Sequence, residues 1–320
     1  MSGLAIQNNQ SRVAALPEAR ASFVGLVRGE LRKIVGLRIF WAIVGVMTLM
    51  VVFSQILLAT TPNGAQQLRN APLDAYVNAI SGDFAIVRIL SGIMALILAA
   101  HVVGLEYQQG TIRILLGRGV GRLQLLGAKA FALLLVIVAF MAVLLLIEFA
   151  FIWGISVGMA GASHPWTALT GEFWADIWGF MLYLLINAVV TLLLGVAASV
   201  LGRSLAFGLA VGLSFFAVDN LGIIVLNVLA QITHSDFWRY LSGVLLGPML
   251  NRLPDYILPP IHGTIQTAHG PETVTRTMSG FGSLPLIWVG ETHALLNIGL
   301  WSLLFIVVAI TLTARRDVLD

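Results

Sequence analysis

The chain has 320 residues, of which 58% are apolar and 10% are charged, whereas roughly a quarter of the residues of a soluble domain are charged. This composition indicates an integral membrane protein and argues against any sizeable soluble domain. The absence of cysteine excludes a disulfide framework, a thiolate metal site and a cysteine nucleophile, and the net charge of +3 is small enough that its distribution along the chain matters more than its size.

The N-terminal region is polar and basic and has no early apolar core, so we expect no cleavable signal and an uncleaved first span. We expect residues 1–21 to be a flexible cytoplasmic N-terminus. Residues 22–37 (SFVGLVRGELRKIVGL) place charged side chains between apolar ones at helical spacing, which predicts an amphipathic helix on the anionic cytoplasmic leaflet. The alternative is a charge cluster that only stops transfer of the chain. The apolar positions are Phe23, Leu26, Val27, Leu31, Ile34 and Val35.

Six apolar runs are long enough to cross a bilayer, which takes about 20 helical residues. They predict an all-α polytopic membrane protein in which residues 38–320 form one six-span domain without a linker to a second domain. The third and fifth runs are long enough to tilt or to extend beyond the lipid. The runs are residues 39–59, 84–104, 130–159, 176–201, 205–230 and 293–313.

Six spans place both termini on one side of the membrane, and the distribution of lysine and arginine chooses the side. Thirteen cations fall in the N-terminal arm, the segment after the second span, the turn after the fourth span and the tail, against five elsewhere. We therefore expect both termini in the cytoplasm and a multi-pass protein of the cell membrane. The five cations assigned to the outside are Arg69, Arg88, Arg239, Arg252 and Arg276.

A charged, glycine-punctuated segment, residues 105–129 (LEYQQGTIRILLGRGVGRLQLLGAK), separates the second run from the third. This basic segment holds one acid, Glu106, and four cations: Arg113, Arg118, Arg122 and Lys129. Apolar residues recur between the cations, which predicts short amphipathic helices lying at the membrane surface. Such a segment offers a surface to a soluble partner. The alternative, that its cations only bind lipid headgroups and set the topology, fits the physics equally well.

The expected outer side has loops at about residues 60–83 and 160–175 and a large segment at about 231–292. The large segment contains an apolar stretch, Phe237–Leu250, which is too short to span the bilayer and predicts a surface-lying or re-entrant helix. Residues 262–283 are rich in Thr, Gly, Ser and His, which is typical of an exposed loop.

Ionisable side chains inside spans are costly and are candidates for function by default. Glu148 and Asp219 qualify, and both lie toward the expected outer boundary at a rise of about 1.5 Å per residue. Together with Asn187 they are candidates for the polar lining of a translocation path. The alternatives are a carboxylate at headgroup level, a carboxylate paired with a neighbouring Asn or Arg, and, for Asn187, a hydrogen bond between helices.

No catalytic or metal-binding constellation is evident in the sequence. The histidines lack a paired spacing such as H-E-x-x-H, no serine sits in a G-x-S-x-G elbow, and no G-x-x-x-x-G-K-[ST] loop is present to bind a triphosphate. We therefore expect no metal, no cofactor and no enzymatic activity of the chain's own. An intramembrane enzyme is also disfavoured, because His101 lies near the inner boundary whereas Glu148 and Asp219 lie near the outer one.

Three features together resemble the ABC-2 type permease family, the membrane subunits of a class of ABC transporters. They are the amphipathic helix before the first span, the E…GT.R.LL…R..LL..K pattern of the basic segment, and the long outer segment before the last span. Here the pattern is carried by Glu106, Gly110, Thr111, Arg113, Arg122 and Lys129. Gly121 departs from it, since the family usually has a small hydroxyl residue there, and we expect looser helix capping as a result.

The resemblance implies that the basic segment forms coupling helices that dock onto a cytoplasmic ATPase subunit, contacted or braced by Glu106, Gly110, Thr111, Arg113, Arg118 and Arg122. It also implies a second permease copy or a homologue, with contact through the first and fifth spans. Gly208 and Gly212 form a G-x-x-x-G in the fifth span that suits this contact, and the alternative is packing within one chain.

The function that the resemblance implies is the permease subunit of an ATP-driven exporter, with membrane lipids as further partners and no nucleic acid. ATP hydrolysis would then take place on a separate polypeptide, because the chain has no phosphate-binding loop. The alternative is a non-transporting accessory or scaffold subunit of a larger membrane complex.

Overall fold

The computed structural model describes residues 22–60, 72–117, 119–158, 169–257, 261–267, 270–276 and 284–315. Within these residues, six helices are long and apolar enough to cross a membrane, which confirms the six-span, helical prediction. The candidate spans are Arg38–Leu57, Ile86–Gln108, Arg122–Gly158, Phe173–Gly202, Leu205–Thr233 and Glu291–Arg315. The predicted N-terminal segment (1–21), parts of two predicted loops (61–71 and 159–168) and Arg118 lie outside the described residues.

The long helices are α2 (Arg38–Thr60), α4 (Pro72–Ala99), α7 (Arg122–Gly158), α8 (Gly171–Gly202), α9 (Leu205–Thr233) and α13 (Glu291–Arg315). Helix α4 continues through a π-helical turn, η1 (Ala100–Gly104), into α5 (Leu105–Gln108). The shorter helices are α1 (Phe23–Gly36), α6 (Thr111–Gly117), α10 (Phe237–Ser242), α11 (Leu246–Arg252) and α12 (Pro254–Ile257). Strands β1 (Ile261–Thr267) and β2 (Gly270–Arg276) follow α12.

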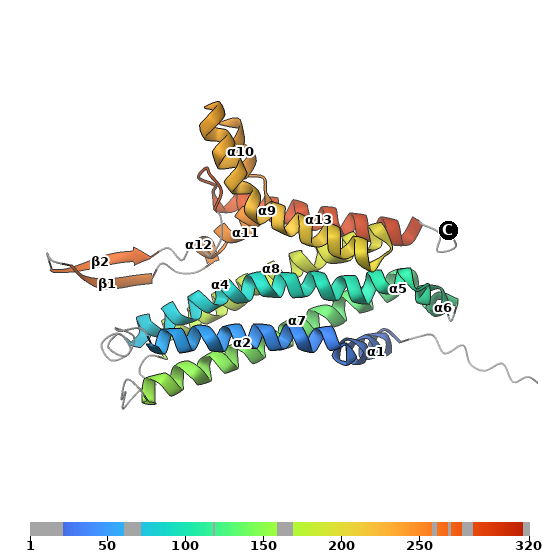
Figure 1. Cartoon of the computed structure of the whole chain (residues 1–320), viewed down its shortest axis with the longest axis horizontal. Helices are drawn as coiled ribbons and strands as arrows, with labels where there is room; N and C mark the ends of the chain where they lie inside the picture. The colour runs from blue at the N-terminus through green and yellow to red at the C-terminus, as the bar shows by residue number, and fades with distance from the viewer. Residues whose placement is uncertain are drawn as a thin grey trace, which may run out of the picture.

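Helices α4 and α8 form the centre of the bundle. The most apolar windows of these two spans are 67% and 72% buried, against 22% for those of α2, α9 and α13. Helices α2 and α7 pack on one side of the central pair, and α9 and α13 pack on the other (Figure 1). The outer helices expose rows of Leu, Ile, Val and Phe, which is the surface that lipid or another membrane subunit would cover.

The two ends of the bundle differ in the elements that they carry (Figure 1). Helices α1, α5 and α6 and the C-terminal end of α13 lie together at one end, which we call the basic end. The hairpin of β1 and β2 lies at the opposite end. A helix at Phe23–Gly36 agrees with the range predicted for the amphipathic helix, while its position on a membrane surface stays a prediction.

The third span begins earlier than the sequence predicted. Residues 122–129 were expected to lie at the membrane surface, yet they form the first two turns of α7, which runs unbroken to Gly158. Helix α7 starts directly after Gly121, whose carbonyl accepts from Leu125 N at 2.9 Å. Ala128 and Lys129 are buried whereas Leu123 is 47% exposed, so this end of α7 packs one face against the protein core and leaves the other at the surface.

The segment before the last span also differs from its prediction. The apolar stretch Phe237–Leu250 contains two helices instead of one: α10 exposes Phe237 and Tyr240, whereas residues 246–251 of α11 are all buried. Part of the predicted loop 262–283 is an antiparallel hairpin, with Ile261 opposite Arg276 and Thr267 opposite Gly270. Its β-branched residues at Ile261, Thr264, Ile265, Thr273 and Val274 favour strands, a signal that the polar composition concealed.

Glycines allow the central helices to approach closely. Gly208 faces Ser199 and Ala100, and Gly212 faces Leu96, so the structure places both in packing within the chain, which is the alternative to a dimer contact. Gly104 has no room for a side chain either, because a Cβ there would lie 2.7 Å from the backbone oxygen of Ser204. Ser204 caps α9 by accepting from Phe207 N at 3.1 Å, which fixes the turn that Gly104 touches.

We expect Gly104→Ala to destabilise the protein by about 1–3 kcal/mol, because the new methyl group would overpack against backbone that cannot move aside. Thermal unfolding in detergent, followed by circular dichroism, measures the effect as a lower Tm. Gly154→Ala is the matched control, since nothing lies within 4 Å of its added Cβ and alanine favours a helix over glycine. Equal Tm values for the two variants would contradict the close approach.

Candidate functional site

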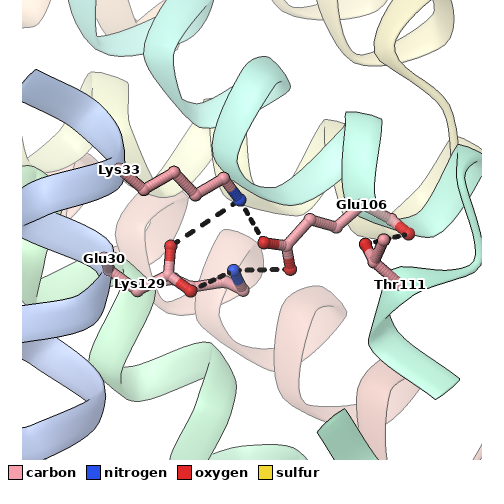
Figure 2. A network of polar contacts seen from close by, with 5 residues as sticks. All are labelled: Glu30, Lys33, Glu106, Thr111 and Lys129. Atoms are coloured by element: carbon pink, nitrogen blue, oxygen red, sulfur yellow. Dashed lines mark hydrogen bonds and ion pairs between the residues drawn. The ribbon is translucent and has the colours of Figure 1, made fainter. Parts of the chain in front are cut away.

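Four charged side chains from three elements meet inside the basic end. Figure 2 shows Glu30 and Lys33 of α1, Glu106 of α5 and Lys129 of α7 pointing toward one another. The Lys129 ammonium lies 2.6 Å from Glu30 Oε1 and 2.6 Å from Glu106 Oε2. Lys33 pairs with the other oxygen of Glu106 and lies 3.9 Å from Glu30 Oε2. We call these four residues the charge cluster.

The charge cluster is buried and internally balanced. Lys129 is 1% exposed, Glu30 7% and Glu106 8%, and its two cations match its two carboxylates. Removing one partner of a buried ion pair is strongly destabilising, by about 3–5 kcal/mol, because it leaves an uncompensated charge in a medium of low polarity. The cluster therefore requires α1, α5 and α7 to be in place together.

The buried stripe of α1 explains how Glu30 enters the cluster. Val27, Glu30 and Ile34 form the buried face of this helix, at the spacing of neighbours on one helix face. Val27 and Ile34 pack in the same apolar core as Ala128 and Ala132 of α7. Glu30 is thus an acid within an apolar stripe, and the Lys129 ammonium opposite it offsets part of the cost of its burial.

The basic segment turns sharply between α5 and α6. Gly110 has a φ of +69°, a left-handed conformation that glycine adopts without strain. Thr111 Oγ1 donates to the backbone oxygen of Glu106 at 3.3 Å, which closes the turn. Helix α6 then packs inward through Ile112, which shares an apolar cluster with Val120 and Leu125.

Helix α6 leaves a mixed apolar and cationic surface at the tip of the basic end. Arg113 is exposed and Ile114 is 60% exposed. Arg122 is half-buried and lines a small cavity with Ile112, Leu116, Leu125, Leu126, Lys129 and Thr313 among others. Exposed positive charge beside exposed apolar area suits contact with an acidic protein surface.

The structure separates the residues that were predicted to contact a partner. Gly110 lies in the turn before α6, Thr111 and Arg113 lie in α6, and Arg122 begins α7. Arg118 lies outside the described residues. Glu106 is different, because its carboxylate is buried among Lys33 and Lys129 of its own chain. Of the two roles predicted for Glu106, bracing fits this geometry and direct contact does not.

A second polar site lies between α4, α8, α9 and α11. Asn187 and Asp219, two of the three predicted path residues, line one cavity together with Arg88, Thr191 and Asn220. Asn187 Nδ2 donates to the backbone oxygen of Arg88 at 3.3 Å. Asn187 Oδ1 is buried and has no hydrogen-bond partner, so an acceptor remains available toward the cavity. Leu246, Gly247 and Leu250 of α11 complete the lining.

Asp219 holds α11 against the bundle. Its carboxylate accepts from Leu246 N at 2.9 Å and from Gly247 N. The backbone just before α11 is also held by α13, since Asn297 Nδ2 and Trp301 Nε1 both donate to Val244 O, at 3.1 and 3.0 Å. Helix α11 is therefore tied to two of the long helices, and it closes the polar cavity on one side.

Glu148, the third predicted path residue, does not line this cavity. It lies on α7 and accepts a 2.7 Å hydrogen bond from Gln55 Nε2 of α2, with both side chains buried. This arrangement matches the alternative of a carboxylate paired with a neighbouring polar side chain. It joins the first span to the third.

Sequence reasoning missed Arg88 and two members of the charge cluster. Arg88 was counted among the outer cations, near the edge of its apolar run, and its burial was not foreseen: it is 2% exposed near the start of the second span. Glu30 and Lys33 were read as surface charges of an amphipathic helix. The burial of Glu30 could have been recognised from its spacing, because it lies three residues after Val27 and four before Ile34, on the apolar face of the helix.

No group of three or more His, Cys, Asp or Glu side chains that could hold a metal ion occurs in the part of the chain that the structure describes. His101 Nδ1 lies 2.9 Å from Ile97 O within its own helix, the contact expected of a satisfied helix histidine. The polar groups of both sites are thus suited to ion pairing and hydrogen bonding.

Comparison with known proteins agrees with the membrane-spanning fold. A family model described as ABC-2 family transporter protein matches residues 25–318, which is nearly the whole chain. No curated protein matches the sequence. The matched range includes α1, the basic segment and all six candidate spans.

We expect Asp219→Asn to weaken the attachment of α11 by about 1–3 kcal/mol. The amide has one oxygen to accept with, and its NH2 group would face one of the two backbone N–H groups that now donate to the carboxylate. Hydrogen exchange measured by mass spectrometry should show faster exchange of the Leu246 and Gly247 amides and little change in α7. Asp236→Asn is the control, since that side chain is 74% exposed. Unchanged exchange at α11 would show that Asp219 does not hold it.

Proposed function

The chain belongs to the ABC-2 family of transporter proteins, and on that premise we propose that it is the permease subunit of an ATP-driven exporter that works as a dimer. Family membership makes it a membrane subunit of an ABC transporter. The observation that carries the finer proposal is the surface at the tip of the basic end, where Arg113 and Ile114 are exposed on a short helix between two spans.

The proposed partner at this surface is a cytoplasmic ATPase subunit. The sequence has no phosphate-binding loop of its own, so hydrolysis would take place on a separate chain. Arg113 and Arg122 would pair with acidic side chains of that subunit, while Ile114 and Leu123, which are 60% and 47% exposed, would enter an apolar part of its surface. Gly110 and Thr111 would set the angle at which α6 meets the partner, and Arg118, which follows α6 in the sequence, would add a further cation.

The proposed transport path uses the polar cavity between α4, α8, α9 and α11. An ionisable group inside a span is a functional candidate because its burial is costly, and Arg88 and Asp219 both line this cavity. With Asn187 and Thr191 they offer hydrogen-bond donors and acceptors to a polar group in transit. Movement of α11 away from Asp219 would open this cavity.

The orientation that the proposal requires can be tested directly, because the chain has no cysteine. In intact cells, a cysteine introduced by Ile114→Cys should resist a membrane-impermeant maleimide, whereas one introduced by Tyr240→Cys, at a position 66% exposed on α10, should react. After the membrane is permeabilised, both should react. Labelling of position 114 in intact cells would place the basic end outside and refute ATPase docking.

We expect the double charge reversal Arg113→Glu/Arg122→Glu to abolish co-purification of the ATPase while leaving membrane insertion intact, since like charges would then face the acidic partner surface. Affinity purification in mild detergent, with identification of the bound chains, measures this.

The control for the charge reversal is Arg239→Glu on α10, an exposed arginine away from the basic end. An ATPase bound at wild-type yield by the double variant would show that docking is elsewhere. A stable complex of the unsubstituted chain with other membrane subunits and no ATPase would instead support the accessory or scaffold function.

A further inference from the structure

We propose that Glu30, Lys33, Glu106 and Lys129 act as positioning residues that make α1 and the α5–α6 turn move as one unit, so that displacement of α6 reaches the first span through α1. This inference rests on the proposed function for the source of the displacement. It assigns to Glu106 a role within its own chain, in place of contact with the ATPase.

The contacts that link α6 to α1 begin at the tip of the basic end. Helix α6 begins at Thr111, whose hydroxyl is bonded to the backbone oxygen of Glu106, so the two residues cannot separate without breaking the turn. The Glu106 carboxylate is bound at one oxygen by Lys33 of α1 and at the other by Lys129 of α7 (Figure 2). A shift of α6 therefore acts on α1 directly through the partly buried Lys33–Glu106 pair and indirectly through the buried Lys129, which also binds Glu30 of α1.

Apolar contacts also join α1 to α6 and α7, in addition to the ion pairs. Leu26 of α1 packs against the cluster of Ile112, Val120 and Leu125, which belong to α6, the following turn and α7. Phe23 of α1 lies with its ring centroid 6.1 Å from that of Phe131 on α7. The two kinds of contact lie on one face of α1, so the helix is held along its length and not at a single point.

Helix α1 is joined rigidly to the first span. A single residue, Leu37, separates α1 from α2; its amide donates to Ile34 O at 3.0 Å and its carbonyl accepts from Phe40 N at 3.1 Å. Trp41 Nε1 on α2 also donates to Val35 O of α1 at 2.8 Å. A one-residue corner with hydrogen bonds across it leaves little freedom between the two helices, so a tilt of α1 is transmitted to α2.

Burial makes the charge cluster suited to this role. An exposed ion pair contributes about 0–1 kcal/mol and exchanges readily with water, whereas Lys129 is 1% exposed and has carboxylates from two elements on either side. Separating α1 from α5 would leave a buried carboxylate or ammonium without its partner. The cluster is thus stable only while its four side chains stay in contact, which keeps α1, α5 and α7 together while the assembly as a whole moves.

The test uses the permease in complex with its ATPase, with spin labels at Val24→Cys on α1, a position that is 73% exposed, and at Gly117→Cys on α6, an exposed position where nothing lies within 4 Å of an added Cβ and which the proposed docking surface does not use. Pulsed electron paramagnetic resonance gives the distance distribution between the labels with and without ATP and vanadate. In the otherwise unsubstituted chain we expect one narrow distribution that nucleotide leaves unchanged.

The test variant is Glu30→Leu/Lys129→Met, which replaces a buried pair by apolar side chains of similar size, a change that proteins often tolerate without loss of stability. We expect the α1–α6 distribution to broaden and to shift with nucleotide. The ATPase should still co-purify, with its KM for ATP unchanged and its kcat returned to that of the free ATPase. Arg28→Gln/Arg32→Gln, which removes two exposed charges from the same helix, is the matched control and should behave as wild type.

A narrow, nucleotide-independent distribution in the double variant would overturn the inference, and so would a nucleotide-dependent α1–α6 distance in the unsubstituted chain. If the double variant does not fold, Lys33→Met/Glu106→Gln removes the direct ion pair between α1 and α5 and leaves the Glu30–Lys129 pair balanced; it should give partial broadening, and no broadening there would count equally against the inference. If no ATPase binds even the unsubstituted chain, the proposed function fails, while the label distance in the permease alone still tests the charge cluster.

Discussion

The burial of the Lys129 ammonium between two carboxylates is the constraint on which the basic end of this protein depends. An ion that is 1% exposed is stable only when opposite charges and hydrogen bonds replace the water it has lost. Glu30 supplies one carboxylate from α1, before the first span, Glu106 supplies the other from α5, at the end of the second, and Lys33 balances the remaining charge. Since the four groups must converge, α1, α5 and α7 have a fixed arrangement, and the exposed cation Arg113 remains outside the charge cluster.

The remaining buried polar groups follow the same rule with other partners. Asp219 accepts from the backbone of α11, and Glu148 accepts from Gln55 across α2 and α7. Each of these bonds joins two elements that hydrophobic contact alone would leave free to slide in an apolar environment. The difference between the two carboxylates is their surroundings, because Asp219 lines a cavity with Arg88 and Asn187 whereas Glu148 is one half of a tie between two helices.

Several features were predictable because their signals are local. Long apolar runs gave the six spans, and helical spacing gave a helix at α1. The start of α7 was missed because Arg122 and Lys129 interrupt the apolar run, although helix backbone bonds continue through them. The burial of Arg88 was missed for a related reason: hydropathy averages over a window, so it does not separate an exposed cation at the edge of a span from a buried one. The hairpin of β1 and β2 was missed because polarity was given more weight than its β-branched residues.

The sequence by itself determined that this protein crosses a membrane, how often it does so and which segment carries its concentrated charge, since hydropathy, periodicity and charge counts are properties of neighbouring residues. Only the tertiary structure decided which charges face each other. The partners in the charge cluster are 99 residues apart for Glu30 and Lys129 and 73 apart for Lys33 and Glu106. It likewise decided that Gly208 and Gly212 pack within the chain. A buried charge is satisfied by whatever the fold brings within about 4 Å of it, and no local pattern encodes that neighbour.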